Sequence, residues 1–414
     1  MIIPSIDIMN NKAVQLRQGK EKVLEEEKVR TLAESFAKVG EIAVIDLDAA
    51  MNRGNNRTLI NELARTYPVR VGGGIRNIEK ALEVMRSGAQ KIIIGSAALT
   101  KEGLNTDFLR NLKKRIGRDQ IIIALDIKGE MVFTQGWHKN SGISYKKLLS
   151  MIPEFANEVL ITDIDVEGTM SGINREKYLR IADSTNARVT AAGGVGSLED
   201  ISFFADLGFN VQLGMSLYTG TIDLESAFVN GLAWKNELLP TITRDTNGNI
   251  LMVAYSNKES LKKSIQTGLM WYYSRSRKRL WQKGETSGNI QQLVGFKVDC
   301  DNDAIIATVR QINEACHTNK YSCFDDRPFS LNELYEIIGE RIENAPTDSY
   351  TATLTDEKLK AKILEEAAEV TDFTDRENLI WEISDLLYFI SVMMVKQKIS
   401  WEEILFELRR RKFK

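Results

Sequence analysis

Cysteine, histidine and proline are scarce in this chain of 414 residues, which has three cysteines, two histidines and six prolines. Three cysteines are too few, and an odd number, for a disulfide framework, so we expect a cytoplasmic protein. No N-terminal signal is visible and about 18 consecutive apolar residues occur nowhere, so we expect no membrane partner. A net charge of −2 provides no basic field for nucleic acid. The remaining composition, 43% hydrophobic and 27% charged, is that of a globular protein with two or three domains.

Short apolar runs alternate with amphipathic stretches over the first 230 residues. Each run is continuous rather than alternating, which is typical of strands buried on both faces. Eight strands separated by helices favour a (β/α)8 barrel over an open sheet. The expected strands are residues 2–6, 42–47, 69–71, 92–94, 121–125, 159–164, 189–192 and 211–213.

This region also repeats itself at an offset of 119 or 120 positions, which indicates two half-barrels. The repeated residues are Asp7 with Asp126, Gly73 and Gly74 with Gly193 and Gly194, and Gly95 with Gly214. Two carboxylates at the C-terminal ends of strands can serve as general base and general acid on one substrate. The glycines let the backbone approach a phosphate closely, so two cradles predict a ligand with a phosphate at each end. The alternative is that the Asp residues cap helices and the glycines form turns.

Several segments resemble the phosphoribosylformimino-AICAR-ribotide isomerase of histidine biosynthesis. They are MIIPSID at 1–7, VGGGIR at 71–76, IGSAA at 94–98, GW at 136–137, TDID at 162–165 and AGGV at 192–195. The resemblance implies a rearrangement that opens an aminoaldose with two phosphates and moves a proton to give a ketose. It assigns Asp7 as the base, Asp126 as the acid and Trp137 as a stacking residue. It also implies substrate contacts from Gly73, Gly74, Arg76, Gly95, Ser96, Thr162, Gly193, Gly194 and Gly214.

The sequence departs from this family in three places, one of which is the segment Lys20–Arg30, which is poor in the loop features expected there. Gln15 stands where the family usually has Arg, and Glu167 stands where it commonly has an active-site Asp. A barrel that only binds phosphoribosyl ligands or supports assembly is the alternative. The residues also leave open whether the barrel isomerises phosphoribosylanthranilate.

The middle section is expected to be β-rich, with strands at 250–255, 270–274, 293–298 and 304–309 and a hairpin turn at 245–248. If the third strand continues, Asp299, Asp301 and Asp303 share one face and Cys300 points to the other. Three converging carboxylates favour a hard cation such as Mg²⁺. Cys300, Cys316 and Cys323 offer three thiolates, the pattern of a catalytic Zn²⁺ with an open fourth position. The alternative is that they are small buried hydrophobic residues.

A second polar cluster in this section combines arginine donors, hydroxyls and glycine, which suits phosphate and nucleotide edges. A solvated charged loop is the alternative. The cluster contains Ser274, Arg275, Arg277, Lys283, Glu285, Thr286 and Ser287.

The middle section resembles phosphoribosyl-AMP cyclohydrolase through SRSR at 274–277, KGETSG at 283–288, DCD at 299–301, CH at 316–317 and SCF at 322–324. This resemblance implies zinc-dependent hydrolytic opening of the adenine ring between N1 and C6. It also implies that His317 transfers a proton and that the zinc site is assembled between two subunits.

The last section is expected to be a small helical bundle with helices at 331–343, 356–372, 377–396 and 400–411. Capping boxes at 330–333, 374–377 and 400–403 begin three of them. Acidic side chains among apolar neighbours predict a Mg²⁺ site that could hold a triphosphate. The alternative is a solvated acidic face, which is the preferred interpretation for Glu365 taken alone. They are Glu365, Glu366, Glu369, Glu382 and Asp385. This pattern resembles the all-α nucleotide pyrophosphohydrolases, in particular phosphoribosyl-ATP pyrophosphohydrolase.

The sequence therefore predicts a barrel at 1–230, a β-rich α+β domain at 231–328 and a helical domain at 329–414. The three resemblances together imply consecutive steps of histidine biosynthesis on phosphoribosyl nucleotides, with chain order the reverse of reaction order. They also imply a homodimer formed through the two C-terminal domains.

Overall fold

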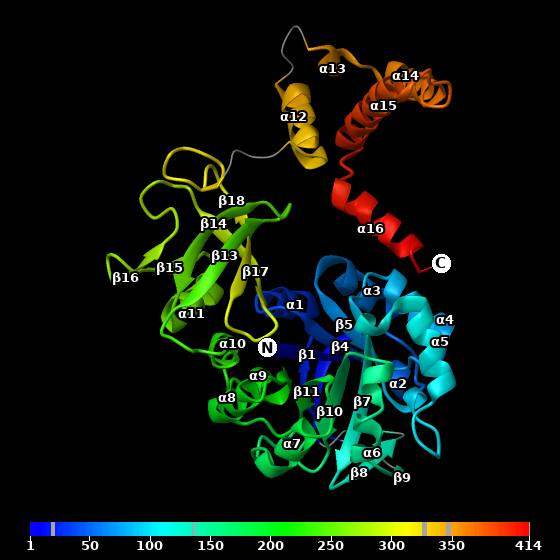
Figure 1. Ribbon diagram of the computed structural model, residues 1–414, viewed down its shortest axis with the longest axis vertical. Coiled ribbons are helices and arrows are strands. Elements are labelled where there is room, and N and C mark those ends of the chain that lie inside the picture. Colours follow the sequence, from blue (N-terminus) through cyan, green and yellow to red (C-terminus); the bar gives the residue numbers. More distant parts are fainter. Residues whose placement is uncertain (18–20, 135, 138, 325–328, 345–348, 414) are drawn as a thin grey trace. The chain divides into compact units, whose positions relative to one another are not determined.

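A computed structural model describes the chain except residues 18–20, 135, 138, 325–328, 345–348 and 414. It divides into two compact units, Met1–Asp326 with Lys412–Lys414, and Arg327–Arg411. The first unit contains both the barrel and the β-rich domain (Figure 1). Each unit is described by itself below.

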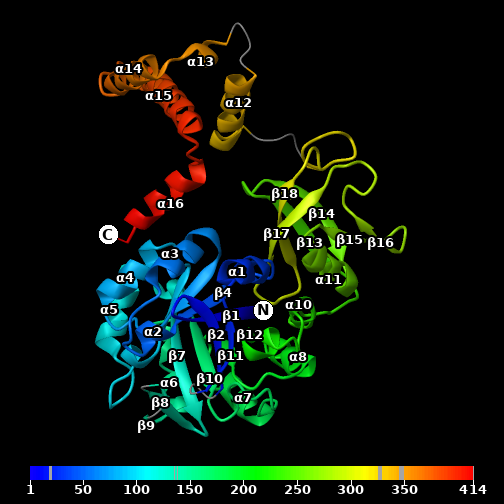
Figure 2. The ribbon, with the colours of Figure 1, turned by 180° about the vertical axis from the view of Figure 1, so that it is seen from behind.

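The N-terminal region is a closed barrel of eight parallel strands, which confirms the fold expected from the apolar runs. Each strand pairs with the next, and β10 closes the ring on β7. Figure 2 shows the strands from behind, surrounded by helices. The strands are β1 (Ile2–Met9), β4 (Ile42–Asp46), β5 (Val69–Gly72), β6 (Lys91–Ile94), β7 (Ile121–Lys128), β10 (Glu158–Asp163), β11 (Arg188–Ala192) and β12 (Asn210–Leu213). The helices are α1 (Val29–Ala37), α2 (Leu47–Ala50), α3 (Arg57–Thr66), α4 (Ile78–Arg86), α5 (Thr106–Ile116), α6 (Tyr145–Leu149), α7 (Arg175–Ala182), α8 (Leu198–Asp206), α9 (Met215–Tyr218) and α10 (Leu224–Asn230).

Two antiparallel hairpins extend the barrel at equivalent places in its halves. β1 continues into β2 (Lys12–Arg17) and β3 (Glu21–Glu26), and β7 continues into β8 (Met131–Thr134) and β9 (Lys139–Ser144). Asp7 pairs with Val14 and Asp126 with Phe133 in matching positions. The twofold repeat in the sequence is therefore also a repeat of structure.

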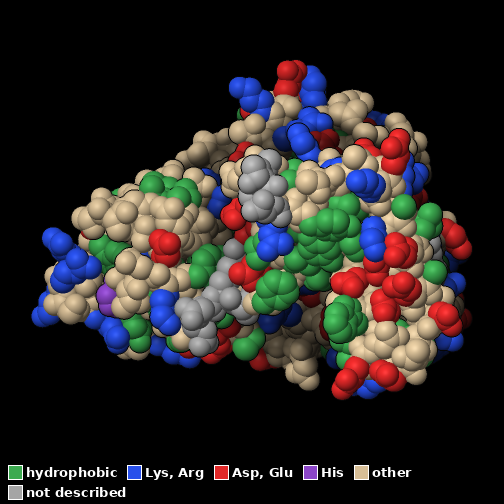
Figure 3. Space-filling view, turned by 90° about the horizontal axis from the view of Figure 1, so that it is seen from above, with side chains coloured by type: hydrophobic (Ala, Val, Ile, Leu, Met, Phe, Trp, Pro, Cys, Tyr) green, Lys and Arg blue, Asp and Glu red, His purple; other side chains and the backbone are tan. Residues whose placement is uncertain are grey.

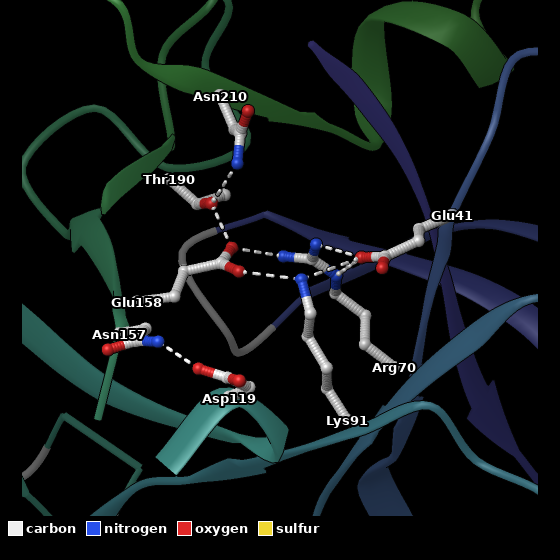
Figure 4. Close-up of polar contacts among 8 residues, drawn as sticks. All are labelled: Glu41, Arg70, Lys91, Asp119, Asn157, Glu158, Thr190 and Asn210. Atoms are coloured by element: carbon white, nitrogen blue, oxygen red, sulfur yellow. Dashed lines mark hydrogen bonds and ion pairs between the residues drawn. The ribbon is translucent and has the colours of Figure 1, made fainter. Parts of the chain in front are cut away.

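The bottom of the barrel, at the N-terminal ends of the strands, is filled by a buried ionic network (Figure 4). The Arg70 guanidinium, 1% exposed, forms ion pairs with Glu41 and Glu158. Lys91 Nζ lies 3.0 Å from Glu158 Oε2, and Thr190 donates to the same carboxylate. Pairing offsets part of the desolvation cost of these buried charges. Barrel enzymes carry their chemistry at the opposite, C-terminal ends of the strands.

The β-rich domain is a four-stranded sheet in the order β14-β13-β18-β17 with a separate β15–β16 hairpin. Its elements are β13 (Leu239–Asp245), β14 (Ile250–Ser256), α11 (Lys258–Thr267), β15 (Trp271–Ser274), β16 (Arg279–Gln282), β17 (Gln291–Val298) and β18 (Ile305–Gln311). The expected turn at 245–248 joins β13 to β14, and Gly248 there has φ +94°. The expected continuation of β17 is wrong, because the strand ends at Val298 and residues 299–303 form a turn.

The barrel and the sheet share a hydrophobic contact. Phe228 on α10 stacks on Phe296 of β17 with ring centroids 5.3 Å apart, and the Phe296 amide donates to the Lys38 carbonyl at 2.8 Å. Val39, Phe228 and Val229 from the barrel belong to the hydrophobic core of the β-rich domain. The barrel thus contributes directly to that core.

The second unit is helical, and four of its helices match the expected ones within a few residues. They are α12 (Leu331–Glu343), α14 (Asp356–Glu369), α15 (Arg376–Gln397) and α16 (Trp401–Arg411), joined by the short α13 (Tyr350–Thr353). Ser330 caps α12, and Ser400 and Glu403 form the expected reciprocal cap. The cap expected at Thr374 is wrong by one residue, because the Asp375 carboxylate accepts from the amides of Glu377 and Asn378.

α15 is the one helix in the described residues that is long and apolar enough to cross a membrane. This is weak evidence, because a core helix of a soluble protein meets the same criterion. α15 contributes Phe389 and Val392 to the core of its domain, packs against α12 and α14, and carries the acidic Glu382 and Asp385. These contacts are those of a domain's central helix.

Candidate functional site

The mouth of the barrel brings together three carboxyl groups. Asp7 lies on β1 and Asp126 on β7, and Glu167 follows β10. Burial raises the pKa of Asp7 to about 6, opposed by a hydrogen bond from Ser5 Oγ at 3.0 Å. Burial likewise raises the pKa of Asp126 to about 6. Acids with such pKa values can both take up and release protons near neutral pH.

Of the three carboxyl groups, that of Glu167 has the pKa furthest from its ordinary value. Burial, followed by the charges of Asp7, Asp126 and Asp163, raises its pKa to about 8. It lines a pocket together with Asp7, Gly193 and Gly214. The longer side chain at this position therefore still reaches the barrel mouth, where it is mostly protonated at neutral pH.

Asp126 is held by two donors, one from the loop between β8 and β9 and one from the neighbouring strand β10. The side chains of Trp137 and Thr162 both hydrogen-bond to its carboxylate, which opposes the effect of burial on its pKa. Trp137, whose φ is +71°, was expected to stack on the substrate base. In this structure it orients Asp126, and the stacking role stays a prediction.

The glycines of the two halves adopt matching conformations. Gly73 and Gly193 have φ of +96° and +92°, and a Cβ would lie 2.2 Å from the Asp46 carbonyl oxygen or 2.7 Å from Glu167 Oε2, respectively. Gly95 and Gly214 each precede a short helical turn with similar backbone angles, φ −93° and −120° with ψ −114° and −93°. Gly73 and Gly193 require glycine because of their positive φ and their close neighbours, as the predicted phosphate cradles would; phosphate binding itself stays a prediction.

The remaining barrel residues of the prediction lie close to these cradles. Gly74 and Gly194 follow the first glycine of each pair with φ of +68° and +78°, and Ser96 begins the turn after Gly95. Arg76 binds the carbonyls of Ala49 and Ala50 at 3.2 and 2.7 Å, so in this structure it braces α2.

Most of the residues that line this pocket were absent from the predicted site, and among them are the polar residues Gln15, Glu167 and Gln212. Gln15 and Glu167 had been noticed only as departures from the family pattern. Gln212 lies within an apolar strand and belongs to no sequence motif, so nothing in the sequence marks it as a site residue. Only the closure of the barrel brings these three to the same pocket.

The β-rich domain brings together two of its three cysteines. The side chains of Cys316 and Cys323 are in hydrogen-bond contact, and the Thr318 hydroxyl, 3.0 Å from Cys316 Sγ, lowers the pKa of that thiol. The charge of Lys283 favours the thiolate of Cys323, whereas burial raises the pKa of that thiol. His317 Nδ1 lies 3.9 Å from Cys316 Sγ.

Cys300 does not join this pair within one chain. It is exposed, and among the described residues the three sulfurs do not form a group within 4.8 Å. A zinc site that uses all three thiolates would therefore need Cys300 of a second subunit, as the resemblance to the cyclohydrolase implies, and this site stays a prediction.

The carboxylates of Asp299, Asp301 and Asp303 do converge within 4.8 Å. They do so through a turn rather than along one strand face, because the Asp299 carboxylate accepts from the amides of Asp303 and Ala304. Lys235 forms ion pairs with Asp301 and Asp303 at 3.4 and 2.5 Å. The cluster was predicted correctly, but its geometry was not.

The predicted nucleotide-binding segment surrounds the β15–β16 hairpin. Arg275 lies 3.9 Å above the ring of Tyr255, and the Arg277 amide donates to Ser274 Oγ at 3.2 Å. Lys283 is buried, which lowers its pKa. The rest of this predicted set, Glu285, Thr286 and Ser287, is exposed.

In the helical domain the carboxylates of Glu366, Glu382 and Asp385 lie within 4.8 Å of one another. Burial, followed by a hydrogen bond with Glu382, raises the pKa of Glu369, so this residue also belongs to the cluster. Glu365 does not: its carboxylate is half exposed and pairs with Lys362 at 3.0 Å. One residue along a helix turns the side chain by about 100°, which takes Glu365 away from the face of Glu366.

The fold and these sites define a multidomain enzyme with isomerase and hydrolase activities, built from a barrel, a cyclohydrolase domain and a helical pyrophosphohydrolase domain. Three family models match in this order: histidine biosynthesis protein over residues 1–223, phosphoribosyl-AMP cyclohydrolase over 252–325 and phosphoribosyl-ATP pyrophosphohydrolase over 331–412. The chain belongs to the histidine biosynthesis protein family.

Curated relatives match the two parts of the chain separately. An imidazole-4-carboxamide isomerase from Methanocaldococcus jannaschii is 37% identical over 237 residues, covering 55% of this chain and 97% of the relative. The histidine biosynthesis bifunctional protein HisIE of Pyrococcus furiosus is 43% identical over 193 residues, covering 43% of this chain and 92% of the relative. A histidine biosynthesis trifunctional protein from Kluyveromyces lactis is 41% identical over 171 residues, covering 40% of this chain and 22% of the relative.

Glu167 also makes the stability of the barrel depend on pH. Because the folded-state pKa of about 8 lies above the ordinary value of 4.5, folding favours the protonated carboxyl. The resulting stabilisation is present below pH 4.5 and is lost as the pH rises through 8. We expect Glu167→Gln to remove this loss, so that the variant unfolds at higher denaturant than the parent at pH 9 and similarly at pH 5. Chemical unfolding at the two pH values measures this; an equal change at both would contradict it.

Proposed function

We propose that this chain catalyses three consecutive steps of histidine biosynthesis in the cytoplasm. The helical domain removes pyrophosphate from phosphoribosyl-ATP, the β-rich domain opens the adenine ring of phosphoribosyl-AMP, and the barrel converts the resulting aminoaldose to a ketose. The observation that carries the isomerase assignment is the pair of carboxyls with raised pKa, Asp7 and Asp126, at the ends of strands in opposite halves of the barrel.

The barrel chemistry needs one acid and one base. Protonation of the sugar ring oxygen by Asp126 opens the aminoaldose, and Asp7 then removes the proton from the carbon next to the amine-bearing carbon. The hydroxyl on that carbon becomes the ketone oxygen as the amine-bearing carbon gains a proton. Glycine cradles in the two halves hold the two phosphates so that the sugar lies between the carboxyls.

The direct test supplies the whole protein with phosphoribosyl-ATP, Mg²⁺ and Zn²⁺ and identifies the end product by mass spectrometry and chromatography against both standards. Ketose as the end product supports three activities. Accumulated aminoaldose would overturn the isomerase assignment and leave a barrel that only binds ligands or supports assembly.

The cysteines of the β-rich domain fit a zinc site. Thiolates are preferred zinc ligands, and the lowered pKa of Cys316 and its contact with Cys323 supply two of them. Zn²⁺ would supply Lewis-acid activation of the water that opens the ring. His317, beside Cys316, is placed to move a proton, and Arg275, Arg277 and Lys283 provide positive charge for the phosphate.

The third thiolate comes from Cys300 of a second subunit in this proposal. Exposed hydrophobic side chains support a homodimer through the two C-terminal domains, including Phe324 in one and Ile380, Trp381 and Leu405 in the other. Figure 3 shows hydrophobic side chains at the surface between charged ones.

Complementation tests this shared site. Cys300→Ser and Cys316→Ser should each lose zinc and cyclohydrolase activity, because each removes one ligand. Co-expression of the two should restore about a quarter of the activity, since half of the dimers are mixed and each mixed dimer has one intact site. Zinc content and cyclohydrolase rates of the co-expressed protein measure this. If zinc content and cyclohydrolase activity do not recover, all the zinc ligands come from one subunit.

The acidic cluster of the helical domain fits Mg²⁺, because several carboxylates converge where unpaired charge is costly. Mg²⁺ would neutralise the triphosphate during its hydrolysis. Glu382→Gln should lower the pyrophosphohydrolase rate by about a hundredfold or more and weaken its Mg²⁺ dependence. Glu365→Gln is the matched control, because Glu365 lies outside the cluster, and it should change the rate little. Equal effects of the two would contradict the assignment.

A further inference from the structure

Two amide side chains in the barrel mouth have unmet hydrogen-bonding groups. Gln15 lies on β2 and is 5% exposed, and Gln212 lies half-buried on β12. In the described part of the chain, neither Gln15 Nε2 nor Gln212 Oε1 has a hydrogen-bond partner. Both residues line the pocket that contains Asp7 and Gly214.

Keeping these two atoms unpaired costs folding free energy, because a buried polar atom has given up its water. The Tyr218 hydroxyl donates its hydrogen to the Ser5 carbonyl at 3.3 Å, and its oxygen is near the Gln15 amide without forming a hydrogen bond of acceptable geometry with Nε2. The carbonyl end of Gln15 lies over Gly214, where a Cβ would be 2.7 Å from Oε1. This contact leaves the amide nitrogen as the free end.

The two free atoms are complementary in kind, since one is a donor and the other an acceptor. A hydroxyl group satisfies both, because it accepts from Gln15 and donates to Gln212. A carboxylate or phosphate oxygen satisfies only Gln15 and is repelled by the Gln212 oxygen. Unmet polar groups of this kind strongly disfavour a ligand that lacks the matching group.

We propose that Gln15 and Gln212 form a neutral subsite that binds the sugar hydroxyl on the carbon from which Asp7 removes the proton. This inference rests on the proposed isomerase function and names the group that positions the sugar beside the base. It also predicts discrimination against substrates that present an anion at this place.

Binding of the aminoaldose and of its analogue lacking that hydroxyl tests the subsite. Both are titrated by calorimetry into the full-length protein carrying Asp126→Asn, which prevents turnover. With both amides present, the aminoaldose should bind about tenfold more tightly than the deoxy analogue. Gln15→Met or Gln212→Met in the same background should lower this ratio, because the aminoaldose loses one of its two contacts and the deoxy analogue loses none. The double variant should bring the ratio close to one, since no amide then remains to bind the hydroxyl.

Three controls separate this subsite from a structural role. Gln120→Met, in the helical turn just before β7 and at the opposite end of the barrel from the mouth, should leave the ratio unchanged. Gln15→Met should not lower the melting temperature, since it removes an unpaired amide, and the two hydrolase activities report that the chain is folded. An unchanged ratio in both amide variants, or an equal loss of affinity for both ligands, would overturn the proposal. Absence of ketose formation by the unmodified protein would instead contradict the isomerase function, because the binding ratio does not depend on turnover.

Discussion

Asp126→Asn is expected to lower the isomerase kcat by about 10²- to 10⁴-fold while leaving both hydrolase activities intact. The amide keeps the shape of the carboxyl group but cannot donate a proton to the sugar ring oxygen. The Trp137 and Thr162 side chains that orient Asp126 would still hold the substituted side chain near its place. The loss should therefore appear in kcat more than in KM.

Asp107→Asn is the matched control, because Asp107 is an exposed acid on α5 that pairs with nearby Arg110 at 3.3 Å. It should leave all three activities unchanged. The isomerase kcat/KM of the unmodified protein should fall as the pH drops below about 6, where Asp7 becomes protonated. Asp7→Asn should abolish both this acidic limb and most of the rate. Stopped assays of ketose formation from purified aminoaldose measure these values, and full turnover in Asp126→Asn would refute the role of this residue.

The parts of the fold that the sequence predicts are those governed by burial. Continuous apolar runs such as residues 121–125 mark strands covered on both faces, and all eight barrel strands lie where these runs occur. The hairpin strand β3 carries no such signal, because most of its side chains are exposed and charged. Its conformation depends on pairing with β2, a long-range contact that periodicity does not report.

Residues of the sites were predictable where neighbours in sequence are neighbours in space. Glu366 and Glu369, or Glu382 and Asp385, follow from helical spacing. Glu365 was predicted wrongly, because one residue along the helix rotates its side chain away from the face of Glu366. The placement of Cys300 depends on a second subunit, which one chain does not test. The raised pKa of Glu167 depends on carboxyls contributed by three different strands or loops, so only the closed barrel reveals it.

The shared core leads to the second large effect, on the stability of the β-rich domain. Phe228 is a barrel residue by sequence, yet it is 1% exposed and packs on Phe296 in the core of the neighbouring domain. Phe228→Ala should destabilise the β-rich domain by about 3–5 kcal/mol, the range for removing a buried phenylalanine. Cyclohydrolase activity should then be lost at lower temperature than in the parent, whereas pyrophosphohydrolase activity should not change.

Hydrogen exchange distinguishes this effect from a general weakening of the barrel. The Phe296 amide, which donates to Lys38 across the contact, should exchange faster in Phe228→Ala. Phe204→Ala is the matched control, because Phe204 is equally buried but packs on Tyr178 inside the barrel's own core. A barrel that unfolds independently of the sheet would leave the Phe296 amide protected in this control. If Phe204→Ala exposes that amide as much as Phe228→Ala does, the two domains unfold as one cooperative unit. If the Phe296 amide stays protected in both variants, the contact between α10 and β17 contributes little stability.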